Sequence, residues 1–163
     1  MINLPNTKMH WKTPLLPMAF AIRRFDKDDA YAVLELANAN AAFDGTTSEA
    51  DLAITASFPQ GSWVAEDEGE VIGFAYGCFR DVPEKVLERW KARKVGHIEL
   101  MAVDAKHRGR GVGSALMARL LEEFKAAGAD MVTLDCPAEA EEGIRLYRKL
   151  GFSVRFYGLK KRL

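Results

Sequence analysis

Residues 98–121 read IELMAVDAKHRGRGVGSALMARLL, and this stretch decides how the chain folds. Its opening, residues 98–103, is mainly apolar, which is typical of a buried strand. A basic, glycine-rich loop follows at residues 106–113, and apolar side chains then recur with the period of a helix. The pattern predicts a strand, a loop and a helix in that order.

The loop has the chemistry of an anion site. Gly109, Gly111 and Gly113 can take positive φ and approach a ligand closely, so that N–H groups at the start of the helix point inward. Four basic side chains between residues 106 and 110 add positive charge, and the helix dipole adds roughly half a charge more. We therefore expect the loop to bind a diphosphate.

Two common phosphate motifs fit this loop poorly. A Walker A loop needs a lysine directly before Ser114, and the chain has a glycine there. The dinucleotide fingerprint G-x-G-x-x-G nearly fits from Gly109, with Asp135 as the ribose-binding acid, but Ser114 replaces its third glycine. The first half of the chain also lacks a repeating βαβ pattern. A nucleoside triphosphatase is disfavoured, and a dinucleotide-binding domain is kept as a minor alternative.

Three matching motifs carry a resemblance to a known family. Arg108-x-x-Gly111-x-Gly113 resembles the signature [QR]-x-x-G-x-[GA] of the GNAT superfamily of acetyl-CoA-dependent N-acetyltransferases. Residues 63–75, WVAEDEGEVIGFA, are similar to the strand-turn-strand of that family, and residues 146–152, LYRKLGF, are similar to its L-Y-x-x-x-G-F motif. The resemblance covers about residues 18–163.

The resemblance implies an α/β (α+β) fold of three layers. We expect a mixed, mostly antiparallel sheet of about six or seven strands, flanked by about four helices, in a domain spanning residues 18–163 after an N-terminal extension at 1–17. Hydrophobic periodicity and turn residues place the elements. The expected strands are 18–23, 62–66, 70–79, 97–104, 131–134 and a final hairpin of 152–157 with 159–163; helices are expected from Asp26, from Ser48, and at 84–94, 113–127 and 139–150.

Composition excludes several classes of function. The chain has 163 residues, of which 48% are hydrophobic, enough for one core. Twenty-three basic side chains balance 23 acidic ones, which argues against a nucleic-acid or membrane-surface role. Cys78 and Cys136 are too few for a disulfide framework, and their spacing does not predict a metal site. Residues 19–21 imitate a signal-peptidase site, but Pro14 and Pro17 interrupt the short apolar stretch, so we expect a cytoplasmic protein.

The resemblance implies that acetyl-CoA is the co-substrate, with no metal. Its pantetheine arm would bind to the main chain of the strand, and its diphosphate would bind over the loop. The positions carried over as cofactor-binding are Met101, Ala102, Val103, Arg108, Gly109, Arg110, Gly111, Val112, Gly113 and Ser114. The chain has Ala140 and Gly143 where the family often has Asn and Ala, which puts cofactor affinity in doubt.

Acetyl transfer to an amine needs a base and an acid. An alkyl ammonium has a pKa of about 10.4, so a group must remove its proton, directly or through water. Glu99 is the best-placed carboxylate for this role, His97 on the same strand face is the reserve base, and the resemblance places Tyr147 at the general-acid position. A main-chain N–H near Met101 would stabilise the oxyanion. The expected reaction is direct attack by a primary amine on acetyl-CoA.

The sequence leaves the acceptor open. A small molecule or a peptide would both serve, and a homodimer through the final strands is a further expectation. Resemblance makes Phe43 and Asp44 candidate acceptor contacts, although Phe43 is more often a core residue. The helix at residues 84–94, with Trp90, is interpreted either as a lid or, preferably, as a helix packed on the sheet. A non-catalytic acyl-CoA-binding or sensor module is the main alternative function.

Overall fold

One mixed sheet organises the chain. The computed structural model describes residues 20–40 and 48–162. The strands lie in the sheet in the order of the sequence: β1 (Ala21–Arg24), β2 (Ser62–Asp67), β3 (Glu70–Phe79), β4 (Val95–Val103) and β5 (Met131–Leu134). The pairs β1–β2, β2–β3 and β3–β4 are antiparallel, and β5 is parallel to β4.

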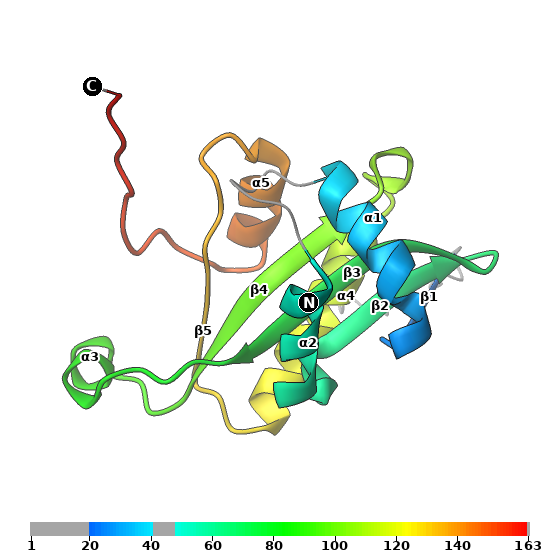
Figure 1. Cartoon of the computed structure of the whole chain (residues 1–163). Helices are drawn as coiled ribbons and strands as arrows, with labels where there is room; N and C mark the ends of the chain where they lie inside the picture. The colour runs from blue at the N-terminus through cyan, green and yellow to red at the C-terminus, as the bar shows by residue number, and fades with distance from the viewer. Residues whose placement is uncertain (1–19, 41–47, 163) are drawn as a thin grey trace, which may run out of the picture.

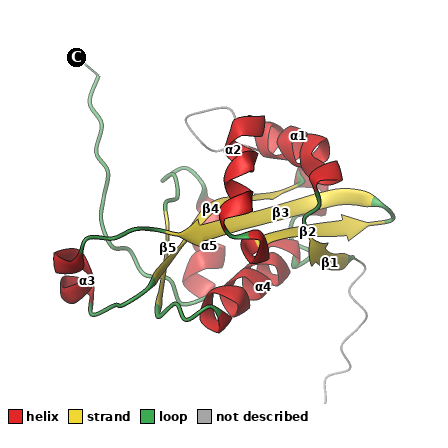
Figure 2. Ribbon diagram, turned by 60° about the horizontal axis from the view of Figure 1, so that its bottom comes forward, coloured by secondary structure: helices red, strands yellow, loops and turns green. Residues whose placement is uncertain are grey.

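Helices cover both faces of the sheet. They are α1 (Ala30–Asn40), α2 (Glu49–Ala53), α3 (Glu84–Trp90), α4 (Val112–Ala126) and α5 (Glu141–Lys149). Figure 1 shows how the chain runs through these elements. Figure 2 shows α1 and α2 above the sheet and α4 beneath it, which gives the three layers expected from the sequence.

Local sequence signals explain several element ends. The Asp26 side chain accepts a hydrogen bond from the Asp28 N–H at 3.0 Å, and the Asp26 N–H donates one to the Asp29 carboxylate at 2.8 Å. These bonds belong to a capping box at the start of the turn that leads into α1. The hairpin between β2 and β3 turns at Glu68 and Gly69, which both have positive φ, of 51° and 84°. Two positive φ values in a two-residue loop match the twist of the flanking strands.

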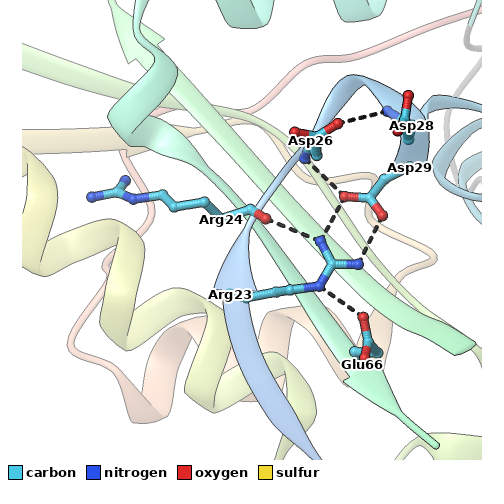
Figure 3. Close-up of polar contacts among 6 residues, drawn as sticks. All are labelled: Arg23, Arg24, Asp26, Asp28, Asp29 and Glu66. Atoms are coloured by element: carbon cyan, nitrogen blue, oxygen red, sulfur yellow. Dashed lines mark hydrogen bonds and ion pairs between the residues drawn. The ribbon is translucent and has the colours of Figure 1, made fainter. Parts of the chain in front are cut away.

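Arg23 joins β1 to this capping box and to β2 (Figure 3). Its guanidinium donates two hydrogen bonds to the Asp29 carboxylate, at 2.7 and 2.8 Å, and one to Glu66 at 2.7 Å. The Asp29 side chain is only 10% exposed, and the bonds from Arg23 hold the pKa of its carboxyl below the ordinary value of 3.8. This bidentate pair fixes the first helix on the sheet.

Two hydrophobic clusters form the core, one on each face. The cluster under α4 includes Ile98, Leu116, Met117, Leu120 and Phe124, and the cluster under α1 and α2 includes Val33, Leu52, Phe74 and Tyr76. Two glycines admit the Phe124 ring close to the sheet. A Cβ atom at Gly77 or Gly96 would lie 2.6 Å from a ring carbon of Phe124, so neither position has room for a side chain.

A β-bulge interrupts β4 at Glu99. Tyr76 of β3 is paired with Leu100, but the next residue, Gly77, is paired with Ile98, which leaves Glu99 as the extra residue. Ile98 therefore packs in the cluster under α4, whereas Leu100 packs against the cluster under α1, although two residues on one regular strand would share a face. The bulge sets the direction of Glu99.

Two expectations are corrected by the structure. The described residues form five strands rather than six or seven, while the five α-helices lie where the five helical stretches were expected. The final hairpin is not formed: residues 152–162 follow α5 without regular structure, because their apolar side chains find no partner strand, and Phe156 and Leu159 are 55% and 97% exposed. The homodimer expected through these strands stays a prediction.

α3 was preferably expected to pack on the sheet, and its position differs from that expectation. It lies within the long β3–β4 connection, apart from the other helices (Figures 1 and 2). None of its residues belongs to either core cluster. Its Trp90 ring packs instead beneath the guanidinium of Arg155, 4.7 Å from the ring centroid. Across the described ranges, no helix is long and apolar enough to cross a membrane.

Candidate active site

A cavity of about 1030 Å³ opens where β4 and β5 part. β5 pairs with β4 only from Val95 to Ile98, and within the described chain no strand pairs with the remainder of β4 on that side. The cavity is lined by the end of β4, the loop before α4, the start of α4, the segment after β5, and α5. The unpaired edge of a strand and the start of a helix therefore face the same space.

Nine of the ten predicted cofactor-binding residues line this cavity. They are Met101, Ala102, Val103, Arg108, Gly109, Gly111, Val112, Gly113 and Ser114. The exception is Arg110, whose guanidinium pairs with Asp67 at the end of β2, at 2.9 Å. Its charge is partly neutralised there, outside the cavity lining.

The three loop glycines play two different parts. Gly109 and Gly111 have φ values of 73° and 85°, and a Cβ atom at either would meet nothing within 4 Å. Packing does not require glycine at these two positions; the positive φ of the backbone does. The space next to both residues, at the start of α4, is open. Gly113 does not have positive φ, which corrects the expectation: its Cβ would lie 3.1 Å from Leu146, so it permits close packing of α4 against α5.

Arg108 lines the cavity between α1 and α5. Its Nη2 donates to Asn40 Oδ1 of α1 at 2.9 Å, and its Nη1 lies 3.4 Å from Glu142 of α5. The side chain is 44% exposed, so its charge stays available to a ligand. Arg108 and the N-terminus of the 15-residue helix α4 both bring positive charge to this end of the cavity, where Glu142 brings a negative charge.

Tyr147 of α5 also lines the cavity. Burial raises the pKa of its phenol to about 12, and the neighbouring Cys136 acts in the same direction. The ring packs edge-on against Phe152, with 6.0 Å between centroids. A phenol with this pKa is protonated at neutral pH, as a proton donor must be.

Glu99 does not line the cavity but lies two residues before Met101, which does. Its carboxylate is 29% exposed and contacts the guanidinium of Arg80, with Nε and Nη2 each 3.3 Å from Oε1. The thiol of Cys78 donates to the same oxygen at 3.3 Å. Burial raises the pKa of the Cys78 thiol most, and the hydrogen bond to Glu99 and the negative charge of Glu99 raise it further.

His97, the reserve base, is nearly inaccessible. Its side chain is buried, and Nδ1 lies 2.8 Å from the Thr133 hydroxyl of β5. Burial lowers its pKa, and the nearby charge of Arg80 lowers it further. The imidazole is therefore neutral near pH 7, but it is engaged with β5 and away from solvent.

Sequence reasoning missed Arg80, Asn40 and Cys136. Arg80 contacts Glu99 across a strand pair, Asn40 meets Arg108 from α1, and Cys136 lines the cavity after β5. No motif marks these residues, because each reaches the site only through long-range packing. Phe43 and Asp44 lie outside the described residues. In the part of the chain that the structure describes, no group of three or more His, Cys, Asp or Glu side chains is placed to hold a metal ion.

Comparisons with known proteins agree on one family. The Acetyltransferase (GNAT) family matches residues 27–152. A mycothiol acetyltransferase of Saccharomonospora viridis is 29% identical over an alignment of 160 residues that covers 91% of this chain and 51% of that protein. A probable glucosamine 6-phosphate N-acetyltransferase of Oryza sativa subsp. japonica is 48% identical over 59 residues, which are 36% of this chain and 34% of that protein.

Solved structures give the same answer. The crystal structure of Ard1 from Thermoplasma volcanium superposes with a TM-score of 0.70 at 29% identity and covers 85% of both chains. This chain spans about half or less of the length of the two relatives described above. The match over residues 27–152 includes β2 to β5, α4 and α5, and every residue that lines the cavity. The chain belongs to the GNAT family of acetyltransferases.

Proposed function

We propose that this protein transfers an acetyl group from acetyl-CoA to a primary amine of a small molecule or a peptide, by direct attack in a ternary complex. The observation that carries the proposal is the cavity in which the unpaired edge of β4, the glycine loop before α4 and Tyr147 meet. Membership of the GNAT family supports acetyl transfer as the chemistry.

The residues present fit acetyl-CoA. The main chain of Met101 to Val103 would hold the two amides of the pantetheine arm, because this edge of β4 has open donors and acceptors among the described strands. The backbone around Gly109 and Gly111, with Arg108, would hold the diphosphate. When bound, acetyl-CoA supplies an activated acetyl thioester. Arg110 has a smaller part in this scheme because it pairs with Asp67.

Glu99 and Tyr147 would then share the proton transfers. Glu99 accepts one proton from the substrate ammonium, directly or through water, and leaves a neutral nucleophile. The nitrogen bonds to the acetyl carbon as the carbon–sulfur bond breaks, and Tyr147 gives its proton to the departing sulfur. The second nitrogen proton restores the phenol. A main-chain N–H near Met101 stabilises the negative charge on the carbonyl oxygen.

A panel of amines tests this function. The purified protein is incubated with acetyl-CoA and with amino acids, amino sugars, polyamines and peptides, while released thiol and acetylated product are both quantified. We expect thiol and product to appear in equal amounts with at least one class of amine. Binding of coenzyme A without any product would favour a non-catalytic acyl-CoA-binding module, and binding of NAD instead would favour a dinucleotide-binding domain.

A further inference from the structure

Arg80 is a cation placed next to the proposed base. It follows β3 directly, and its N–H donates to the Val95 carbonyl at 3.2 Å, so its backbone is fixed by the β3–β4 pairing. Its side chain is 46% exposed and extends towards Glu99. The backbone of Arg80 is therefore fixed, while its guanidinium is accessible to solvent.

The contact between Arg80 and Glu99 is a loose one. Its three donor–acceptor distances are all 3.3 Å, whereas Arg23 binds Asp29 at 2.7 and 2.8 Å. Half-exposed ion pairs with long contacts contribute little to folding. The Arg80 guanidinium can therefore exchange its partner at small cost, since a bidentate carboxylate or phosphate offers it shorter bonds.

The charges around Glu99 favour an acceptor that carries both signs. A simple ammonium is attracted by Glu99 but repelled by Arg80, and the pair as a whole has no net charge. The neighbouring His97 senses these charges. Burial lowers its pKa most, the positive charges of Arg80 and Arg155 lower it further, and the negative charges of Glu99 and Asp135 raise it. An amine that also carries an anionic group can satisfy both members of the pair.

We propose that Arg80 determines acceptor specificity by binding an anionic group, a carboxylate or a phosphate, of the amine that is acetylated. The inference rests on the acetyltransferase function proposed above and narrows its substrate class to amines that carry such a group. When the anion binds Arg80, it replaces Glu99 as the partner of the guanidinium. The Glu99 oxygens are then released next to the ammonium, and Glu99 can accept its proton.

Matched acceptor pairs test the proposal. One pair is phenylalanine and phenethylamine, which differ by the carboxylate, and the other is glucosamine 6-phosphate and glucosamine, which differ by the phosphate. We expect the anionic member of at least one pair to have a kcat/KM about 10- to 100-fold higher, the range for a charge-assisted hydrogen bond. The two pairs distinguish a carboxylate acceptor from a phosphate acceptor.

Two variants locate the preference at Arg80. In Arg80→Gln the ratio of kcat/KM within the preferred pair should fall to within about threefold, because a neutral amide replaces the charge. The control is Arg119→Gln on α4, which has the same change of charge and a surface ion pair of the same 3.3 Å length to Glu122, and it should keep the wild-type ratio. A wild-type protein that prefers the uncharged amine in both pairs, or an Arg80→Gln variant that retains the preference, would overturn the proposal.

A binding measurement separates this inference from the proposed function. If no amine is acetylated, the function has failed, and calorimetry with phenylalanine and glucosamine 6-phosphate on the coenzyme A-saturated protein decides the role of Arg80. Binding of either compound that weakens at least tenfold in Arg80→Gln, and not in Arg119→Gln, supports an anion site at Arg80. Equal binding to wild type and Arg80→Gln, or no binding to either, rejects it.

Discussion

Replacing Gly111 by glutamate tests the acetyl-CoA site, with a matched control at the opposite end of the same helix. Gly111 precedes α4 and Gly128 follows it, with φ values of 85° and 86°, and a Cβ atom at either would meet nothing within 4 Å. Glutamate at either position therefore imposes the same backbone cost, about 1–2 kcal/mol for a left-handed non-glycine residue. Only Gly111 lines the cavity.

The magnitude follows from binding linkage. At a concentration 100 times its dissociation constant, acetyl-CoA adds about 2.7 kcal/mol to the free energy of unfolding. For a chain of 163 residues this raises the melting temperature by about 5–11 °C. If the Gly111→Glu side chain weakens binding by about a hundredfold, the same concentration adds only about 0.4 kcal/mol, and the shift falls to about 1 °C.

The assay is thermal unfolding of each variant with and without acetyl-CoA, so that each protein serves as its own reference. We expect the wild type and Gly128→Glu to show the full ligand shift and Gly111→Glu to lose it. A full shift in Gly111→Glu, equal losses in both variants, or stabilisation by NAD rather than by acetyl-CoA would refute the assignment of the diphosphate to this loop.

Three further changes test the acid, the stability of the first helix and the core. Tyr147→Phe should lower kcat by about 100-fold or more, measured by thiol release, while acetyl-CoA still binds; an unchanged kcat would remove Tyr147 as the acid. The bond from Arg23 lowers the pKa of Asp29, so this bond contributes stability above pH 3.8 that is lost as the pH falls through the lower folded-state pKa. In urea unfolding, Asp29→Asn should therefore lose less stability than the wild type as the pH is lowered into the acid range. Gly96→Ala should cost about 1–3 kcal/mol in the same assay, because its Cβ would lie 2.6 Å from the Phe124 ring, and a cost near zero would contradict that packing.

Signals local in the sequence predicted much of the fold. β3 begins directly after the Gly69 turn, and both ends of β3 and β5 fall at the expected residues, 70–79 and 131–134. α4 ends just before Gly128, whose positive φ makes it a natural stop. The prediction of a final hairpin at residues 152–163 was wrong, because apolar side chains form a strand only where a partner strand is present, and the described strands offer none there.

Among the candidate site residues, those that a motif marks lie together in the cavity, and their role stays a prediction. The loop glycines and the cavity edge of β4 belong to one continuous stretch, where the glycine pattern and the family resemblance pointed to them. The bulge at Glu99 depends on the register between β3 and β4, which alternation in one strand cannot reveal. Arg80 and Asn40 reach the site from positions 19 and 68 residues away from their partners Glu99 and Arg108, and such pairings follow from the packed fold alone.

The direct transfer of the acetyl group to the amine is the central claim, and labelled acetyl-CoA tests it. Cys136 lines the cavity and is the natural alternative acceptor for the acetyl group, although burial raises its pKa and disfavours the thiolate. The protein is mixed with acetyl-CoA labelled in the acetyl group, first without amine and then with it. We predict that no label becomes bound to the protein and that label appears in the N-acetylated product in proportion to released thiol. Label on Cys136 that moves to product when the amine is added would contradict direct attack.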